Sequence, residues 1–250
     1  MSLWYNPGKG WKPFVINRRN LNADVYFCCP GPSLKEIDPT KLNGPGRLVS
    51  AVNNAYPFVR PDIWFGMDDP NCYSRQIFWE PFIKVLRGGY GNRTCEGHQI
   101  CHNYNVCYAD VVKKENALDI FDCSEGVHFI WKKNVMATAL HVLFWMGAKN
   151  IYFIGCDLDN SKADYHHGQV LSEKNKKWNG QLYKDILPWI TRLSEEAKIR
   201  GINFYSCSKK SKLNSESIPY VDIDEAIAKS ESNIPFGGEL THTLDIIKEE

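Results

Sequence analysis

Short apolar runs alternate with helix-like segments along most of the chain. Five of these runs are brief and rich in β-branched or aromatic residues, which is typical of buried strands in a parallel sheet. The five predicted strands cover Val25–Cys28, Leu48–Val52, Ile63–Met67, Ile151–Ile154 and Phe204–Cys207.

Two helices are predicted between and after these runs. Val135–Met146 is apolar nearly all round and stops before Gly147, which indicates a helix enclosed by the core. Apolar side chains recur at helical spacing over Asp185–Arg200, which predicts an amphipathic helix that Gly201 ends. The alternation of strands and helices predicts an α/β fold with a Rossmann-like, doubly wound and mostly parallel sheet.

Two regions interrupt the alternation. Pro70–Trp131 is rich in Asn, Gly, Cys and His, so we expect an insertion between the early strands and the core helix. Asn160–Gly180 is polar and follows a strand end, where a lid over a ligand is expected. A solvated loop without a function is the alternative for this second segment.

Polar residues and glycines follow the predicted strands. Ligands in doubly wound sheets bind beyond the carboxyl ends of the strands, so a cleft is expected there. At the turn Gly31-Pro32-Ser33, the glycine allows close approach of a ligand, and the Ser33 hydroxyl is expected to cap the next helix, whose free amides favour a phosphate or carboxylate. A plain connector is the alternative. The strand-end residues are Gly31, Asn53, Asp68 and Asp157.

Composition narrows the class of protein. The 250 residues are 43% hydrophobic, so we expect a single domain over 1–250 with a sizeable core. The net charge is +1 with both signs interspersed, which argues against a nucleic-acid partner. No apolar run approaches the roughly 20 residues of a membrane span, and the N-terminus lacks a signal-peptide core, so a cytoplasmic location is expected. The sequence leaves a monomer and a homo-oligomer equally open.

The order of the motifs resembles one superfamily over roughly Asp24 to Asp224. Gly-Pro-Ser-Leu-Lys-Glu-Ile-Asp at 31–38 is followed by Asn53 after the second strand and by Lys149–Asp159 around the fourth. This series is similar to the Campylobacter-type bacterial sialyltransferases, which use CMP-sialic acid. It also resembles the domain-of-unknown-function 115 family, which includes flagellin glycosyltransferase-like proteins and a pterin pyrophosphokinase.

The resemblance implies roles for several residues. Gly31, Pro32 and Ser33 form the turn that approaches the nucleotide phosphates, and Asn53 matches the asparagine that reaches the nucleotide. Asn134 stands where the relatives have a Ser-Gly pair at the start of the core helix, and Tyr165 corresponds to a lid tyrosine that donates to the leaving phosphate. Asp68 and Asp157 complete the nucleotide-binding set. Pro30 replaces a donor-binding asparagine, and the sialyltransferase histidine has no counterpart around Tyr183–Asp185.

A base is needed to take the proton of an acceptor hydroxyl, and a histidine titrates near neutrality. His166 and His167, in the lid-like segment, are the candidates. The adjacent pair is equally typical of a loop without catalytic function.

Acidic residues at the strand ends indicate a second possible type of reaction, one that depends on a metal ion. Asp68, Asp69 and Asp157 are oxygen ligands of the kind that magnesium prefers with substrate phosphates. Such a magnesium site favours the pterin-type pyrophosphokinase as the alternative enzyme. Capping of helices is the structural alternative for the same carboxylates.

Nine cysteines are too irregularly spaced for a secreted disulfide framework. Cys95, His98, Cys101 and Cys107 could hold a structural zinc, although their spacing matches no standard finger. The sequence thus predicts a glycosyltransferase with a nucleotide-sugar donor, CMP-linked by resemblance, and a glycan or small-molecule acceptor. A pyrophosphokinase and a non-catalytic nucleotide-binding or interaction module are the alternatives.

Overall fold

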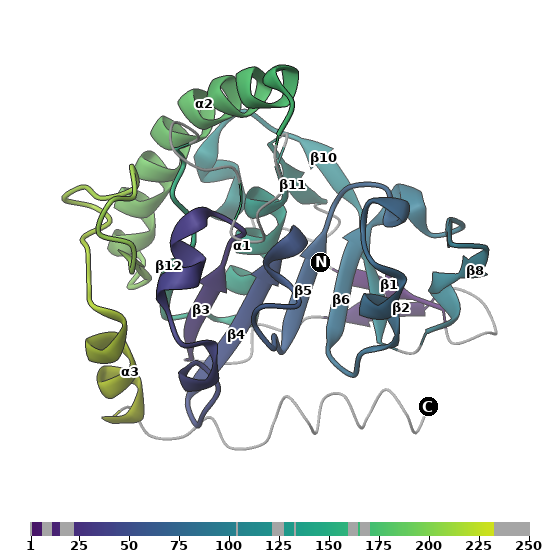
Figure 1. The fold of residues 1–250 in the computed structure, drawn as a ribbon, viewed down its shortest axis with the longest axis horizontal. Coiled ribbons are helices and arrows are strands. Elements are labelled where there is room, and N and C mark those ends of the chain that lie inside the picture. Colours follow the sequence, from purple (N-terminus) through teal and green to yellow (C-terminus); the bar gives the residue numbers. More distant parts are fainter. Residues whose placement is uncertain are drawn as a thin grey trace.

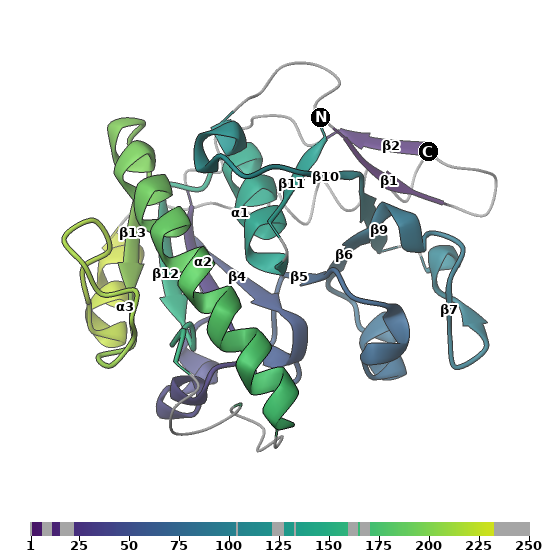
Figure 2. The same cartoon turned by 90° about the horizontal axis from the view of Figure 1, so that it is seen from above.

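The computed structural model describes residues 2–6, 12–15, 23–103, 105–121, 128–132, 134–159, 165 and 171–232. Within them, the strands of the main sheet are β1 Ser2–Tyr5, β2 Lys12–Val15, β3 Asp24–Cys28, β4 Arg47–Val52, β5 Ile63–Gly66, β6 Ile83–Arg87, β9 Val106–Ala109, β12 Asn150–Ile154 and β13 Asn203–Ser206. They form one sheet in the order β13-β12-β3-β4-β5-β6-β9-β1-β2 (Figures 1 and 2). Neighbours from β13 to β9 pair in parallel, whereas β1 pairs antiparallel with β9 and β2. The mostly parallel α/β sheet is confirmed, and it contains all five predicted strands.

The prediction that Pro70–Trp131 forms one insertion is wrong, because two parallel strands of the main sheet, β6 and β9, lie inside this region. The pattern of apolar residues did not reveal either strand, because both are short and lie among polar residues. Lys84 interrupts β6 although its side chain is fully buried. The remainder of the region forms two small pairs, the antiparallel hairpin of β7 Thr94–Cys95 and β8 His98–Gln99 and the parallel pair of β10 Val111–Lys113 and β11 Phe129–Trp131.

In the part of the chain that the structure describes, three α-helices accompany the sheet: α1 Val135–Met146, α2 Glu173–Ile199 and α3 Ile223–Ser232. α1 has the predicted bounds, and Gly147 ends it with a φ of 89°. α2 begins at Glu173 instead of Asp185, so residues 173–180 of the predicted lid are helical. The polar first half of α2 was missed because amphipathic spacing is visible only where a helix packs on the core.

The side chains of β3 alternate between the two faces of the sheet. Val25 and Phe27 join a core cluster with the buried sides of α1 and α2, and Tyr26 and Cys28 join a second cluster that includes Ala226 of α3. The helices therefore cover both faces, as in a doubly wound fold. α3 lies at the β13 end, and the β7–β8 hairpin lies at the opposite end (Figures 1 and 2).

The order in which strands are added to the sheet reverses between β3 and β12. It lays down β3, β4, β5, β6 and β9 in order outward, and then returns to add β12 on the other side of β3. The point where the order reverses is where open α/β sheets hold ligands, beyond the carboxyl ends of the strands. Within the described residues, no helix combines the length and apolar character of a membrane span.

Candidate functional site

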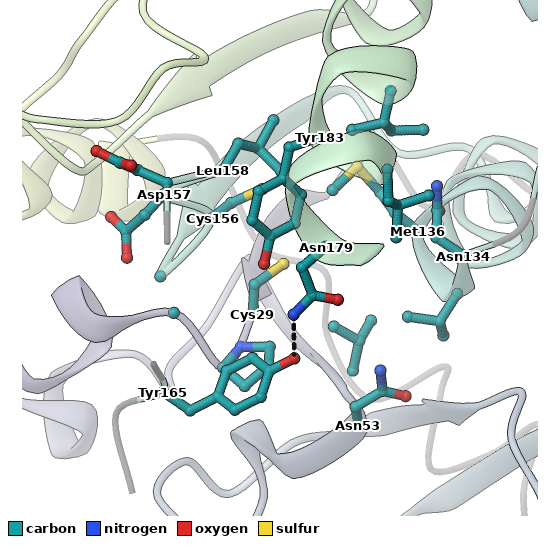
Figure 3. A pocket seen from close by; sticks show the side chains of 18 of the residues that line it. Cys29, Asn53, Asn134, Met136, Cys156, Asp157, Leu158, Tyr165, Asn179 and Tyr183 are labelled. Atoms are coloured by element: carbon teal, nitrogen blue, oxygen red, sulfur yellow. Dashed lines mark hydrogen bonds between the residues drawn. The ribbon is translucent and has the colours of Figure 1, made fainter. Parts of the chain in front are cut away.

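A cavity of about 590 Å³ opens at the carboxyl ends of β3, β4, β5 and β12, under the first half of α2 (Figure 3). Seven of the residues predicted for the site line it, namely Gly31, Pro32, Asn53, Asp68, Asn134, Asp157 and Tyr165. Ser33 and Asp69 are not in the lining. His166 and His167 lie outside the described residues.

The floor of the cavity is made where the loops after β3 and β12 join. The backbone N–H groups of Cys29 and Gly31 donate to the carbonyls of Ile154 and Gly155, each across 2.8 Å. A Cβ atom on Gly31 would stand 2.3 Å from the Gly155 oxygen. The φ of Gly31 is −65°, so this position requires glycine for space and not for its conformation.

Ser33 does not have the predicted role. Gly31 is the N-cap of the 3-10 turn Pro32–Glu36, which has no side-chain cap. The Ser33 N–H donates to Oδ2 of Asp157 across 2.9 Å, and the Ser33 hydroxyl bonds to that of Ser208. A carboxylate of the protein therefore takes the amide that the sequence predicts for a ligand phosphate.

Asn53 is held by a buried phenol that the sequence did not reveal. The Tyr73 hydroxyl donates to Oδ1 of Asn53 at 3.1 Å and accepts from the N–H of Asp68 at 3.2 Å. Burial raises the pKa of Tyr73, so the phenol stays protonated. With Oδ1 occupied, Asn53 presents its amide nitrogen to the cavity (Figure 3). No periodicity or motif marks Tyr73 in the sequence.

α1 begins at the cavity wall. Oδ1 of Asn134 accepts from the Ala137 N–H at 3.1 Å, so Asn134 caps the helix. Val135 and Met136, in the first turn, line the cavity, and the first turn contains no acidic side chain. Their position gives the cavity the partial positive charge of a helix N-terminus.

Two phenols line the cavity, Tyr165 and Tyr183. The Tyr165 hydroxyl accepts from Nδ2 of Asn179 at 3.3 Å. Tyr183, on α2, lines the same cavity, and its hydroxyl points toward the sulfur of Cys29 (Figure 3). Burial raises the pKa of Tyr183, which makes it a hydrogen-bond donor and not a base. Its spacing to Ile186 extends the apolar pattern of the predicted helix by one turn, which is the signal that was overlooked.

Cys29 and Cys156 are both buried and also face the cavity. A hydrogen bond with Cys29, together with burial, raises the pKa of the Cys156 thiol well above its ordinary value. Both cysteines are free of disulfide bonds. Cys29, Cys156 and Tyr183 thus line one part of the cavity, which is also lined by the carboxylates of Asp68, Asp157 and Asp159.

The three carboxylates predicted for magnesium are not brought together. Asp157 accepts from Ser33, and Asp69 turns away to accept from the backbone and side chain of Asn71. Asp68 and Asp157 line the cavity, and so does Asp159. In the described part of the chain, no group of three or more His, Cys, Asp or Glu side chains is placed to hold a metal.

The predicted zinc set is also dispersed. Cys107 packs in the core cluster of α1 and α2, whereas Cys95 and Cys101 pack in the cluster on the other face of the sheet. His98 is exposed on β8 beside the ring of Trp79. The cysteines act here as small apolar side chains, which is the common use of buried free cysteine.

The chain matches no protein-family model and no curated protein sequence. Among solved structures, it is similar to the Campylobacter jejuni sialyltransferase CstII in complex with CMP, with 15% identity, a TM-score of 0.45, and coverage of 85% of this chain and 98% of that one. The sialyltransferase CST-II in complex with a trisaccharide acceptor and CMP is 16% identical, with a TM-score of 0.43 and coverage of 84% of this chain and 100% of that one. The Campylobacter jejuni α-2,3-sialyltransferase Cst-I is 15% identical, with a TM-score of 0.41 and coverage of 90% of this chain and 96% of that one. Overlap at this level does not define an activity, so the function must be inferred from the cavity.

Proposed function

We propose that the protein is a glycosyltransferase that moves a sugar of the sialic-acid type from a CMP-linked donor to an acceptor hydroxyl. The observation that carries this proposal is the cavity at the switch point, which combines an amide donor, a helix N-terminus and two phenols. Its volume is in the range of small-molecule sites.

The donor nucleotide is assigned to the side of the cavity formed by β4 and α1. The Asn53 amide donates to an oxygen of the nucleoside, and Tyr73 fixes the direction of that amide. The phosphate is assigned to the first turn of α1, because backbone amides and the helix dipole favour an anion there. The 3-10 turn after Gly31 is unsuited to the phosphate, since Asp157 already occupies it.

In the reaction, the acceptor oxygen forms a bond to the anomeric carbon, and the bond from that carbon to the phosphate oxygen breaks. Negative charge develops on the departing CMP. Tyr183 and Tyr165 line the cavity and are proposed to donate hydrogen bonds to it, which stabilises the charge of the leaving group. The acceptor proton goes to a base, for which we propose His166 or His167, the two residues that follow the cavity residue Tyr165 in sequence.

The test is release of CMP from CMP-sialic acid, followed with and without acceptor. Asn53→Ala should raise the Kd for CMP by roughly tenfold or more, since a hydrogen bond to a ligand of this kind contributes about 1.4 kcal/mol. Asn54→Ala is the matched control, because Asn54 is next in sequence and does not line the cavity. Tyr73→Phe should weaken binding less than Asn53→Ala. Equal CMP binding by the Asn53 and Asn54 variants would contradict the assignment.

A further inference from the structure

A second hollow, of about 330 Å³, adjoins the main cavity. It is lined by Glu115, Lys132 and Asp185, together with Leu182 and Ile186, which also line the main cavity. The two spaces therefore share a wall on α2. None of the three charged residues was singled out as a site residue by the sequence.

Helical geometry orders the side chains of α2 across the two spaces. At about 100° per residue, the α2 residues that line the two spaces form one side of the helix. Leu182 and Ile186 lie in the middle of this side. Asn179 and Tyr183 lie along one edge of it, and Trp178 and Asp185 lie along the other edge. The first pair lines only the main cavity, the middle pair lines both spaces, and Asp185 lines only the second. Trp178 lies about 10 Å along the helix from Asp185, and its ring is 59% exposed at the rim of the main cavity.

We propose that the second hollow and this edge of α2 form the acceptor subsite, and that the acceptor is a neutral saccharide. This inference rests on the proposed function, because it places the acceptor beside the donor cavity. An exposed tryptophan ring offers a flat apolar surface to one face of a sugar ring. Asp185 and Glu115 accept hydrogen bonds, which suits the hydroxyl groups of a saccharide.

The charges of the hollow favour a neutral ligand over an anionic one. Hydrogen bonds from Lys132 and Lys113 lower the pKa of Glu115 to about 2, so this carboxylate stays ionised. Lys132 is already paired with Glu115, and Oδ1 of Asp185 accepts from Gln181 at 3.0 Å. Lys113 pairs with Glu115 as well, so both ammonium groups are engaged by this carboxylate and neither is left to hold an anionic acceptor.

The test is saturation-transfer NMR with lactose, maltose and cellobiose as neutral probes and glucose 6-phosphate as the anionic probe, at saturating CMP. At least one neutral disaccharide should bind, and Trp178→Ala and Asp185→Asn should each weaken that binding by about fivefold or more. Trp79→Ala is the control, because Trp79 is equally exposed, at 58%, and lines neither space. The Kd for CMP should remain within twofold of wild type in all three variants.

Binding of no neutral probe, preference for the phosphorylated sugar, or equal binding by wild type and Trp178→Ala would overturn the subsite. Failure of the proposed function has a different result, since CMP itself would then not bind to the wild type. Saccharide binding that depends on Trp178 but occurs without CMP affinity would uphold the subsite and reject the donor assignment.

Discussion

The backbone N–H of Ser33 donates to Oδ2 of Asp157 across 2.9 Å, which ties the loop after β3 to the loop after β12. The carboxylate takes the place that a ligand phosphate would need at this turn. A phosphate bound in the cavity must then find its donors elsewhere, and the first turn of α1 provides them.

Replacement of Ser33 should therefore affect stability and not ligand binding. Ser33→Ala keeps the backbone bond to Asp157 but loses the bond to the Ser208 hydroxyl, so we expect a loss of about 1 kcal/mol of unfolding free energy. The Kd for CMP, measured by calorimetry, should stay within twofold of wild type. A large loss of affinity would show that Ser33 contacts the nucleotide, as its sequence motif suggests.

Gly31 should tolerate no side chain. In Gly31→Ala the new Cβ meets the Gly155 carbonyl oxygen and the Asp157 carboxylate, and we expect at least about 1–3 kcal/mol of destabilisation in urea unfolding. Gly89→Ala is the matched control, because nothing lies within 4 Å of a Cβ at that position. Equal stability of the two variants would be incompatible with the packing of the two loops.

The sequence revealed the fold where apolar runs were uninterrupted. β3, β4, β5, β12 and α1 were predicted because most of their side chains are apolar and buried, and β13 was predicted from the aromatic pair Phe204 and Tyr205. β6 was missed because Lys84 occupies a buried position, and a single-sequence pattern cannot show that a lysine is enclosed. The first half of α2 was missed because it covers a cavity and not the core, so its polar positions carry no helical signal.

The candidate site was predictable where it depends on strand ends. Asn53, Asp68 and Asp157 were found because polar residues directly follow buried strands that must end at one edge of the sheet. Tyr73 and Tyr183 come from a 3-10 turn boundary and from a helix, and their distance in sequence from the strand ends concealed them. Asp68 lines the cavity, whereas Asp69 accepts from the Asn71 N–H. This difference depends on a local helix cap that only the structure reveals.

Lys84 should make stability depend on pH. Burial lowers the pKa of Lys84 from an ordinary value of 10.5 to about 7, and its ammonium donates to the Glu80 carbonyl. Between pH 7 and 10.5 the unfolded chain binds more protons at this residue than the folded chain, so its contribution to stability rises with pH, by at most about 1.4 kcal/mol per unit. That contribution is lost as the pH falls toward 7.

Comparison of wild type with Lys84→Met isolates this effect, because the other titrating groups are the same in both proteins. The variant should be the more stable at pH 7, and its advantage should shrink toward pH 9 in urea unfolding. Lys35→Met, at an exposed lysine, should show a constant difference from wild type. A difference independent of pH for Lys84→Met would contradict a lowered pKa.

One of two histidines should carry the proton transfer. His166→Ala or His167→Ala should reduce turnover by about 100- to 10,000-fold, the usual effect of removing a general base, with the Kd for CMP nearly unchanged. His98→Ala is the control, since His98 lies on β8 away from the cavity lining. Full activity of both single variants and of the double variant would reject the pair and leave Tyr165, Asp157 and Asp159 as candidates.

The most direct test of the donor assignment is a thermal-shift panel of CMP, UDP, GDP and ATP, each with and without magnesium. CMP should stabilise the protein without magnesium, and at 100 times its Kd it should add about 2.7 kcal/mol to the free energy of unfolding. At the same CMP concentration the stabilisation should fall to about 1.4 kcal/mol or less in Asn53→Ala, whose Kd is raised roughly tenfold or more, and it should persist in full in Asn54→Ala. Stabilisation by ATP with magnesium alone, and none by CMP, would contradict the account and replace it with a pyrophosphokinase.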